Sequence, residues 1–212
     1  MLFRSQPSLV LPDLGDVSSA ALTPLDERIL GERIMREIRR DPDYADDPVF
    51  YDYLNAIGQH LVGAARQQKV PGMEGAGTFA IQFELFGVRD RSINAFALPG
   101  GFIGVHTGLV VAAESESELA SVLGHEIGHV TQKHIARMYS QQGTNSLIAL
   151  ASIIVAALAV SRNPGAAQGL AMGGQALAIQ NQLSYSRDAE REAERIGLQI
   201  LQAGGFNPQG MP

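Results

Sequence analysis

The sequence of 212 residues contains no cysteine. Without a thiol, the chain can form no disulfide, no thiolate metal site and no cysteine nucleophile. Charge is also scarce, since charged residues make up 18% of the chain and acidic residues outnumber basic ones to give a net charge of −6. Because phosphate binding requires a basic face, this balance argues against nucleic acid as a partner. A hydrophobic content of 45% indicates a globular chain, and its length suffices to bury a core.

Long apolar runs are absent too. The longest, residues 146–160, is shorter than the roughly 20 apolar residues that span a membrane. We expect a buried helix there; the alternative is a membrane-interface element or a lid over a cleft, formed by residues 146–182. Residues 1–22 lack the apolar core of a signal peptide and are expected to be extended, which fits a cytoplasmic protein or a mature or trimmed form. The turn residues after Gly204 suggest a connection to a further domain.

The order of the expected elements along the sequence is helices, a small sheet and then helices, which indicates an α+β fold. Residues 77–88 alternate and are rich in aromatic and β-branched residues, so they predict a strand. Two further short strands are expected around the turn at Pro99, Gly100 and Gly101. Periodicity and capping residues predict helices over residues 23–40, 47–68, 115–140, 146–160, 165–182 and 186–202.

Three of the five histidines lie in one short segment, SVLGHEIGHVTQKH, residues 121–134. His125 and His129 are four residues apart, so on a helix they share one face and can bind one metal ion. Glu126 lies beside the metal, where it can act as the general base for a zinc-bound water. This is the His-Glu-x-x-His pattern of zinc hydrolases. The glycines at 124 and 128 weaken the helix by about 1 kcal/mol each, so we expect another backbone or a substrate to pass close to them.

A catalytic zinc requires a third protein ligand and an open fourth position. On a continuous helix, His134 would lie far round from His129, so we interpret His134 as a flanking or second-sphere residue. Glu190 and Glu194 share one face of the last expected helix. The neighbouring arginines allow an ordinary surface helix with ion pairs. Beside a site of two histidines, however, Glu190 is the best candidate for the oxygen ligand, and Glu194 for the acceptor of a ligand histidine's second N–H.

With the stretches NAFALPGG and SRDAEREAERIG, this pattern resembles the forty-eighth metallopeptidase family, the HtpX-like and BepA-like proteases. The segment LDERILGERIMREIRRDPDY is similar to the BepA-like periplasmic branch in particular. The resemblance covers nearly the whole chain. It implies a mainly helical zincin-type peptidase domain over residues 23–212, with one zinc ion held by His125, His129 and Glu190, and Glu126 as the base. The branch usually carries a C-terminal repeat domain, and we expect these 212 residues to hold the peptidase domain only.

The resemblance also implies how the substrate binds. Asn94, Ala95 and Phe96 are expected on an edge strand that borders the cleft and pairs with the substrate backbone, which agrees with the way that extended peptides add to sheets. Without the resemblance, they would be an ordinary strand end. The chain departs from the family at Glu194, where aspartate is usual, and the side chain here is one methylene longer.

Two functions of different classes follow from these residues. The first is a zinc endopeptidase that cleaves unfolded or misassembled envelope proteins; the second is a metal-stabilised, chaperone-like binding module in a latent, non-cleaving state. The intact Glu126 favours the first, because a binding module needs no base. By resemblance, we expect protein and peptide substrates, a periplasmic location, and contact with the outer-membrane assembly machinery. The apolar segment leaves peripheral membrane contact open.

Overall fold

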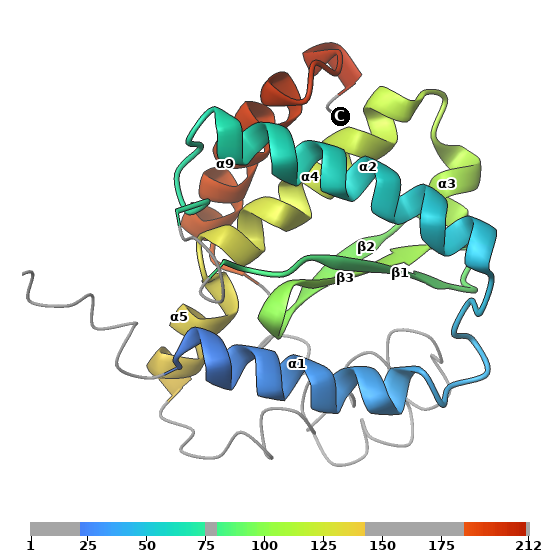
Figure 1. Cartoon of the computed structure of the whole chain (residues 1–212), viewed down its shortest axis with the longest axis horizontal. Helices are drawn as coiled ribbons and strands as arrows, with labels where there is room; N and C mark the ends of the chain where they lie inside the picture. Colours follow the sequence, from blue (N-terminus) through green and yellow to red (C-terminus); the bar gives the residue numbers. More distant parts are fainter. Residues whose placement is uncertain (1–21, 75–79, 143–184, 211–212) are drawn as a thin grey trace, which may run out of the picture.

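The computed structural model describes residues 22–74, 80–142 and 185–210. These residues confirm the α+β class, because a small sheet lies among helices (Figure 1). The elements are, in chain order, α1 (Pro24–Ile38), α2 (Pro48–Gln67), β1 (Glu84–Val88), β2 (Ala95–Leu98), the 3-10 turn η3 (Pro99–Gly101), β3 (Phe102–His106), α3 (Thr107–Ala112), α4 (Glu116–Thr131), α5 (His134–Gln142), α9 (Arg187–Ala203) and the 3-10 turn η4 (Pro208–Gly210).

Side-chain caps explain where the helices begin. Thr23 and Asp26 form a reciprocal capping box at the start of α1, in which each side chain accepts the other's backbone N–H at 3.1 Å. Asp47 accepts from the Val49 N–H at 2.9 Å at the start of α2, and Ser186 caps α9 in the same way. Each such cap stabilises a helix by about 1 kcal/mol. These three helix starts confirm the predictions from sequence.

The three strands form a sheet in the order β1-β3-β2, with β1 parallel and β2 antiparallel to β3. The turn between β2 and β3 requires glycine, because Gly100 and Gly101 have φ angles of 76° and 88°. A Cβ atom on Gly100 would also lie 2.7 Å from the Cα of Arg28 in α1. The two expected strands around this turn are confirmed, whereas the strand expected over residues 77–88 begins only at Glu84.

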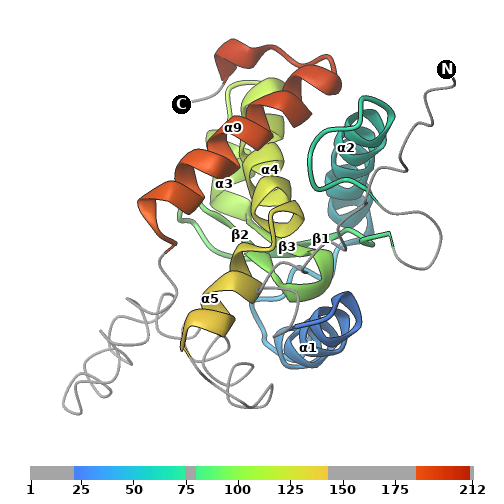
Figure 2. The ribbon, with the colours of Figure 1, turned by 90° about the vertical axis from the view of Figure 1, so that its left-hand side faces the viewer.

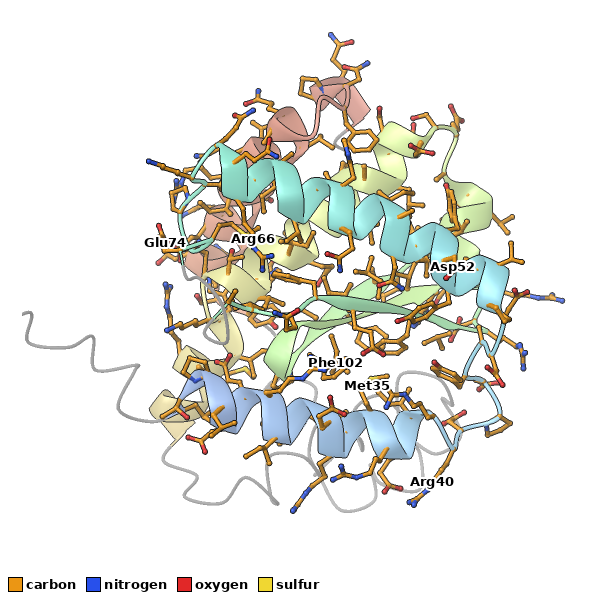
Figure 3. The ribbon with its side chains drawn as sticks, in the orientation of Figure 1. Met35, Arg40, Asp52, Arg66, Glu74 and Phe102 are labelled. Carbon is orange, nitrogen blue, oxygen red and sulfur yellow. The ribbon has the colours of Figure 1, made fainter. Side chains whose placement is uncertain are left out.

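The sheet separates two hydrophobic clusters. The helices α2, α4 and α9 lie on one side of the sheet and α1 lies on the other (Figures 1 and 2). Each cluster joins side chains of the sheet to those of the helices on its side. Figure 3 shows Met35 of α1 and Phe102 of β3 in the second cluster, and both side chains are fully buried. The larger cluster therefore places β2 beside α4, the helix that carries the His-Glu-x-x-His pattern.

The helix expected over residues 115–140 is in fact two helices, which corrects the prediction. The helix α4 ends at Thr131, Lys133 adopts a left-handed φ of 54°, and α5 begins at His134. The capping box expected at the start of α4 is only half formed, since Ser115 accepts from the Glu118 N–H while the Glu118 carboxylate accepts from the Glu114 N–H. The short helix α3 was not expected.

Two predicted segments lie outside the described residues: the N-terminal segment up to residue 21, and the segment 146–182 with its alternatives of a buried helix, a membrane-interface element or a lid. The single-domain assignment of residues 23–212 stays a prediction. Among the residues that are described, no helix combines the length and the apolar character that crossing a membrane requires.

Candidate active site

Close packing of α4 against α9 brings together segments that are far apart in the sequence (Figure 2). A Cβ atom on Gly124 would lie 3.1 Å from the carbonyl oxygen of Gly197, and one on Gly128 would lie 3.0 Å from that of Ala193. Conversely, a Cβ atom on Gly197 would lie 2.9 Å from the Cα of His125. Small residues on both helices therefore permit the approach, and α9 is the passing backbone that the glycines of the motif led us to expect.

This approach places Glu190 of α9 next to the two histidines of α4. Its Oε2 atom lies 3.4 Å from Nε2 of His125 and 3.7 Å from Nε2 of His129, and the two Nε2 atoms are 2.9 Å apart. One ligand atom from each residue fits within a group no wider than 4.8 Å. Two imidazole nitrogens and one carboxylate oxygen are the donor set of a catalytic zinc site. These three residues therefore fit a zinc ion.

His129 is suited to this role because it is held neutral. Its side chain is buried, and burial together with the nearby His125 and His134 lowers its pKa from 6.5 to about 3. A neutral imidazole keeps a lone pair for a metal ion at any pH near neutrality. The ring of Tyr185 stacks on the ring of His129 at a centroid distance of 4.0 Å, and burial raises the pKa of the Tyr185 hydroxyl well above its usual range.

Glu126 lies in a buried environment between α4 and the sheet. Burial and the negative charge of Glu190 raise its pKa from 4.5 to about 8, although a hydrogen bond from the backbone N–H of Ala97 opposes the shift. A carboxyl group with a pKa near neutrality can both accept and release a proton. The same hydrogen bond joins Glu126 to β2, which forms one edge of the described sheet.

Behind His129 lies a polar chain that sequence reasoning did not find. Nδ1 of His134 lies 2.9 Å from Nδ1 of His129, and Nε2 of His134 lies 3.1 Å from Oε2 of Glu192. Arg137 donates to the same Glu192 oxygen at 2.7 Å. His134 was expected as a second-sphere residue, but its partner Glu192 was not identified. The only sequence signal for Glu192 was its place in the acidic pattern of α9.

The structure describes the other predicted site residues, and their roles stay predictions. Glu194 is exposed on α9, one helical turn after Glu190. Asn94 is exposed at the start of β2, and its carbonyl oxygen accepts from the His106 N–H of β3 at 3.0 Å. Ala95 belongs to the larger hydrophobic cluster, beneath α4.

Phe96 points to the opposite face of the sheet. Its ring contacts those of Phe86 and His106 at centroid distances of 5.9 and 5.8 Å. A partner strand at β2 would therefore meet the backbone of Phe96 rather than its ring, because backbone groups form the edge of a sheet.

Comparison with known proteins supports this geometry. The model of the family described as peptidase family M48 matches residues 55–211, which is more than half of the chain. The chain belongs to peptidase family M48. It is thus a metalloprotease domain, a hydrolase by class.

Three relatives show how similar this M48 domain is to known proteins. A Vibrio cholerae protein is 40% identical over 205 residues, which cover 95% of this chain and 40% of the relative. The beta-barrel assembly-enhancing protease of Escherichia coli strain K12 is 34% identical over 202 residues, covering 95% of this chain and 39% of the relative. The mitochondrial metalloendopeptidase OMA1 of Arabidopsis thaliana is 31% identical over 132 residues, covering 62% of this chain and 25% of the relative. The chain thus spans about two-fifths of the length of the bacterial relatives.

Proposed function

We propose that this chain is a zinc-dependent endopeptidase that hydrolyses peptide bonds of unfolded or misassembled envelope proteins. The observation that carries the proposal is the meeting of His125, His129 and Glu190 within 4.8 Å, with the buried carboxyl of Glu126 beside them. A metal site built only for stability needs no such carboxyl, because structural zinc sites are closed by four protein ligands.

Each residue has a distinct part in the proposed reaction. His125, His129 and Glu190 would hold one zinc ion, which supplies a Lewis acid for the substrate carbonyl and lowers the pKa of water. Glu126 removes a proton from the attacking water and then delivers a proton to the amine nitrogen that leaves.

The edge strand β2 supports a substrate that is an extended, unfolded segment. A sheet edge binds such a segment by main-chain hydrogen bonds, which depend little on its sequence. We place Asn94, Ala95 and Phe96 along this edge. Because the Ala97 N–H donates to Glu126, a peptide paired with β2 would run close to the base.

The names of the bacterial relatives suggest where such a protease acts. They are called beta-barrel assembly-enhancing proteases, and we extend this to a periplasmic location for the present chain, with substrates and partners among proteins of outer-membrane assembly. No nucleic acid partner is expected from the net charge of −6.

The test compares the wild-type chain with Glu126→Gln, purified with zinc. Glutamine keeps the shape of the neutral carboxyl but cannot take a proton. The variant should therefore keep one zinc ion per chain and lose casein hydrolysis by about 100-fold or more. Elemental analysis and peptide release measure the two properties. Undiminished hydrolysis in Glu126→Gln would reject this base, whereas a wild-type chain that binds zinc and unfolded protein without cleavage would support the binding-module alternative.

A further inference from the structure

The contact between His134 and His129 depends on the break between α4 and α5. Lys133 has a left-handed φ of 54°, and the turn that it makes brings the first residue of α5 back toward His129. The His134 side chain is 1% exposed, so it makes this contact away from water. Burial of an imidazole without partners is unfavourable. Both ring nitrogens of His134 have partners, His129 on one side and Glu192 on the other.

The hydrogen positions in this chain follow from the metal site. For His129 to bind a metal ion through Nε2, which faces His125 and Glu190, its ring proton must be on Nδ1. This N–H then donates to Nδ1 of His134, 2.9 Å away, so the proton of His134 must be on Nε2. That N–H donates in turn to Glu192, a carboxylate that can only accept. Each N–H in this series of hydrogen bonds therefore has an acceptor: His129 donates to His134, and His134 donates to Glu192.

Two further contacts hold the ends of this series of hydrogen bonds, Glu192 at one end and His129 at the other. Arg137 donates to Glu192 at 2.7 Å; Arg137 lies three residues after His134 on α5, and Glu192 lies two residues after Glu190 on α9. The ring of Tyr185 covers one face of the His129 ring, with planes inclined by 24°. The stacked ring restricts tilting of His129, while the hydrogen bond to His134 restricts its rotation in the plane.

We propose that His134, held by Glu192 and Arg137, is a positioning residue that fixes the tautomer and the orientation of the zinc ligand His129. The inference rests on the proposed zinc site and goes beyond the sequence analysis, which placed His134 only as a flanking or second-sphere residue and gave Glu192 and Arg137 no role. Residues that hold a metal-ligating histidine in this manner typically contribute 10- to 100-fold to metal affinity.

The test separates the hydrogen bond from the volume of the ring. In His134→Asn, the side-chain oxygen can occupy the place of Nδ1 and still accept from His129. His134→Phe keeps a ring of similar size but offers no acceptor. Competition with a zinc chelator should show affinity lowered by about 10- to 100-fold in His134→Phe, and affinity closer to wild type in His134→Asn. Equal losses in both variants, or no loss in His134→Phe, would overturn the proposal.

A second pair of variants avoids the buried position, in case the first pair fails to fold. Glu192→Ala removes the acceptor of His134 and should lower zinc affinity by about tenfold. Asp188→Ala removes another carboxylate of α9, one that is exposed and pairs with Arg191 of the same helix, and should leave the affinity unchanged. Equal affinities in Glu192→Ala and Asp188→Ala would contradict the proposed support of His134.

The tautomer itself can be measured on the metal-free chain by ¹⁵N NMR of the histidine rings. His129 should carry its proton on Nδ1 in the wild type and in His134→Asn, and lose this preference in His134→Phe. A His129 ring protonated on Nε2 in the wild type would overturn the inference. Because this measurement needs neither zinc nor hydrolysis, a chain with the expected tautomer but no peptidase activity would reject the proposed function and leave the role of His134 intact.

Discussion

At the scale of single residues, the site depends on burial to set protonation. Glu126 and His129 lie on the same helix, and burial moves their pKa values in opposite directions, up to about 8 for the carboxyl and down to about 3 for the imidazole. Burial disfavours the charged form of each group, and the charged form is the deprotonated one for an acid and the protonated one for a base. In the metal-free chain both groups are consequently neutral at mildly acid pH, and the neutral imidazole of His129 is the form that can bind a metal ion.

This arrangement predicts how the stability of the metal-free chain depends on pH. Between pH 6.5 and 8, the folded state retains the Glu126 proton while the unfolded state, with a pKa near 4.5, has lost it. The free energy of unfolding should therefore fall as pH rises through this window, by at most about 1.4 kcal/mol per pH unit. The lowered pKa of His129 makes the free energy of unfolding rise with pH, but only below pH 6.5, which is outside this window.

Urea unfolding of the metal-free wild type and of Glu126→Gln, at several pH values in this window, measures the effect. The variant cannot ionise at this position and should show a flatter dependence. Parallel curves for the two proteins would mean that Glu126 is already ionised in the folded state.

At the scale of the elements, the site is a consequence of how closely two helices pack. The proposed ligands of α4 meet the proposed ligand of α9 because glycines stand at the points of contact. An added Cβ atom would meet backbone at all three glycines, and the approach is closest at Gly197, where it would lie 2.9 Å from the Cα of His125. Backbone atoms of two packed helices cannot yield without moving the helices themselves.

Gly197→Ala should therefore weaken both the fold and the metal site. Overpacking of this kind typically costs about 1–3 kcal/mol of stability, and displacement of α9 would move Glu190 away from the two histidines. The matched control is Gly63→Ala in α2, where an added Cβ atom would meet nothing within 4 Å. There the better helix propensity of alanine should stabilise the chain by up to about 1 kcal/mol. Thermal unfolding and zinc competition measure both properties; equal behaviour of the two variants would contradict the packing argument.

The elements also show what the sequence can and cannot predict. The caps at Thr23, Asp47 and Ser186 are local, so the starts of their helices were predicted from neighbouring residues alone. The spacing of His125 and His129 is local in the same sense, and it placed both residues on one face of one helix.

The break at Lys133 could not be predicted in this way. Left-handed backbone usually occurs at glycine or asparagine, and a lysine gives no such signal. The argument that His134 points away from His129 assumed a continuous helix, and the break removes that assumption. The partnership of His134 with Glu192 then depends on how α5 and α9 pack, which no local pattern encodes.

At the scale of the whole molecule, the proposed zinc ion would join parts of the chain that the sheet does not connect. The helix α4 packs over the sheet and lies beside β2, whereas α9 packs on α4 and α2 (Figure 2). A metal ion bound by residues of both helices binds the folded chain and not the unfolded one, so it stabilises the fold by mass action.

Zinc should accordingly raise the melting temperature of the metal-free chain. At a free zinc concentration about 100-fold above the dissociation constant, the stabilisation is about 2.7 kcal/mol. For a chain of this size each kcal/mol raises Tm by about 2–4 °C, so the expected rise is about 5–11 °C.

Two histidine variants test where the zinc binds. His125→Ala removes one of the two proposed nitrogen ligands and should lose most of the rise. His60→Ala changes a histidine of α2 that is bonded to the Gly204 carbonyl, and it should keep the rise. Magnesium, which prefers oxygen ligands in an octahedral arrangement, should have little effect on the wild type. Calorimetry of the three proteins with each ion measures these shifts; an equal rise in His125→Ala and the wild type would mean that zinc stabilises the chain from somewhere other than the junction of α4 and α9.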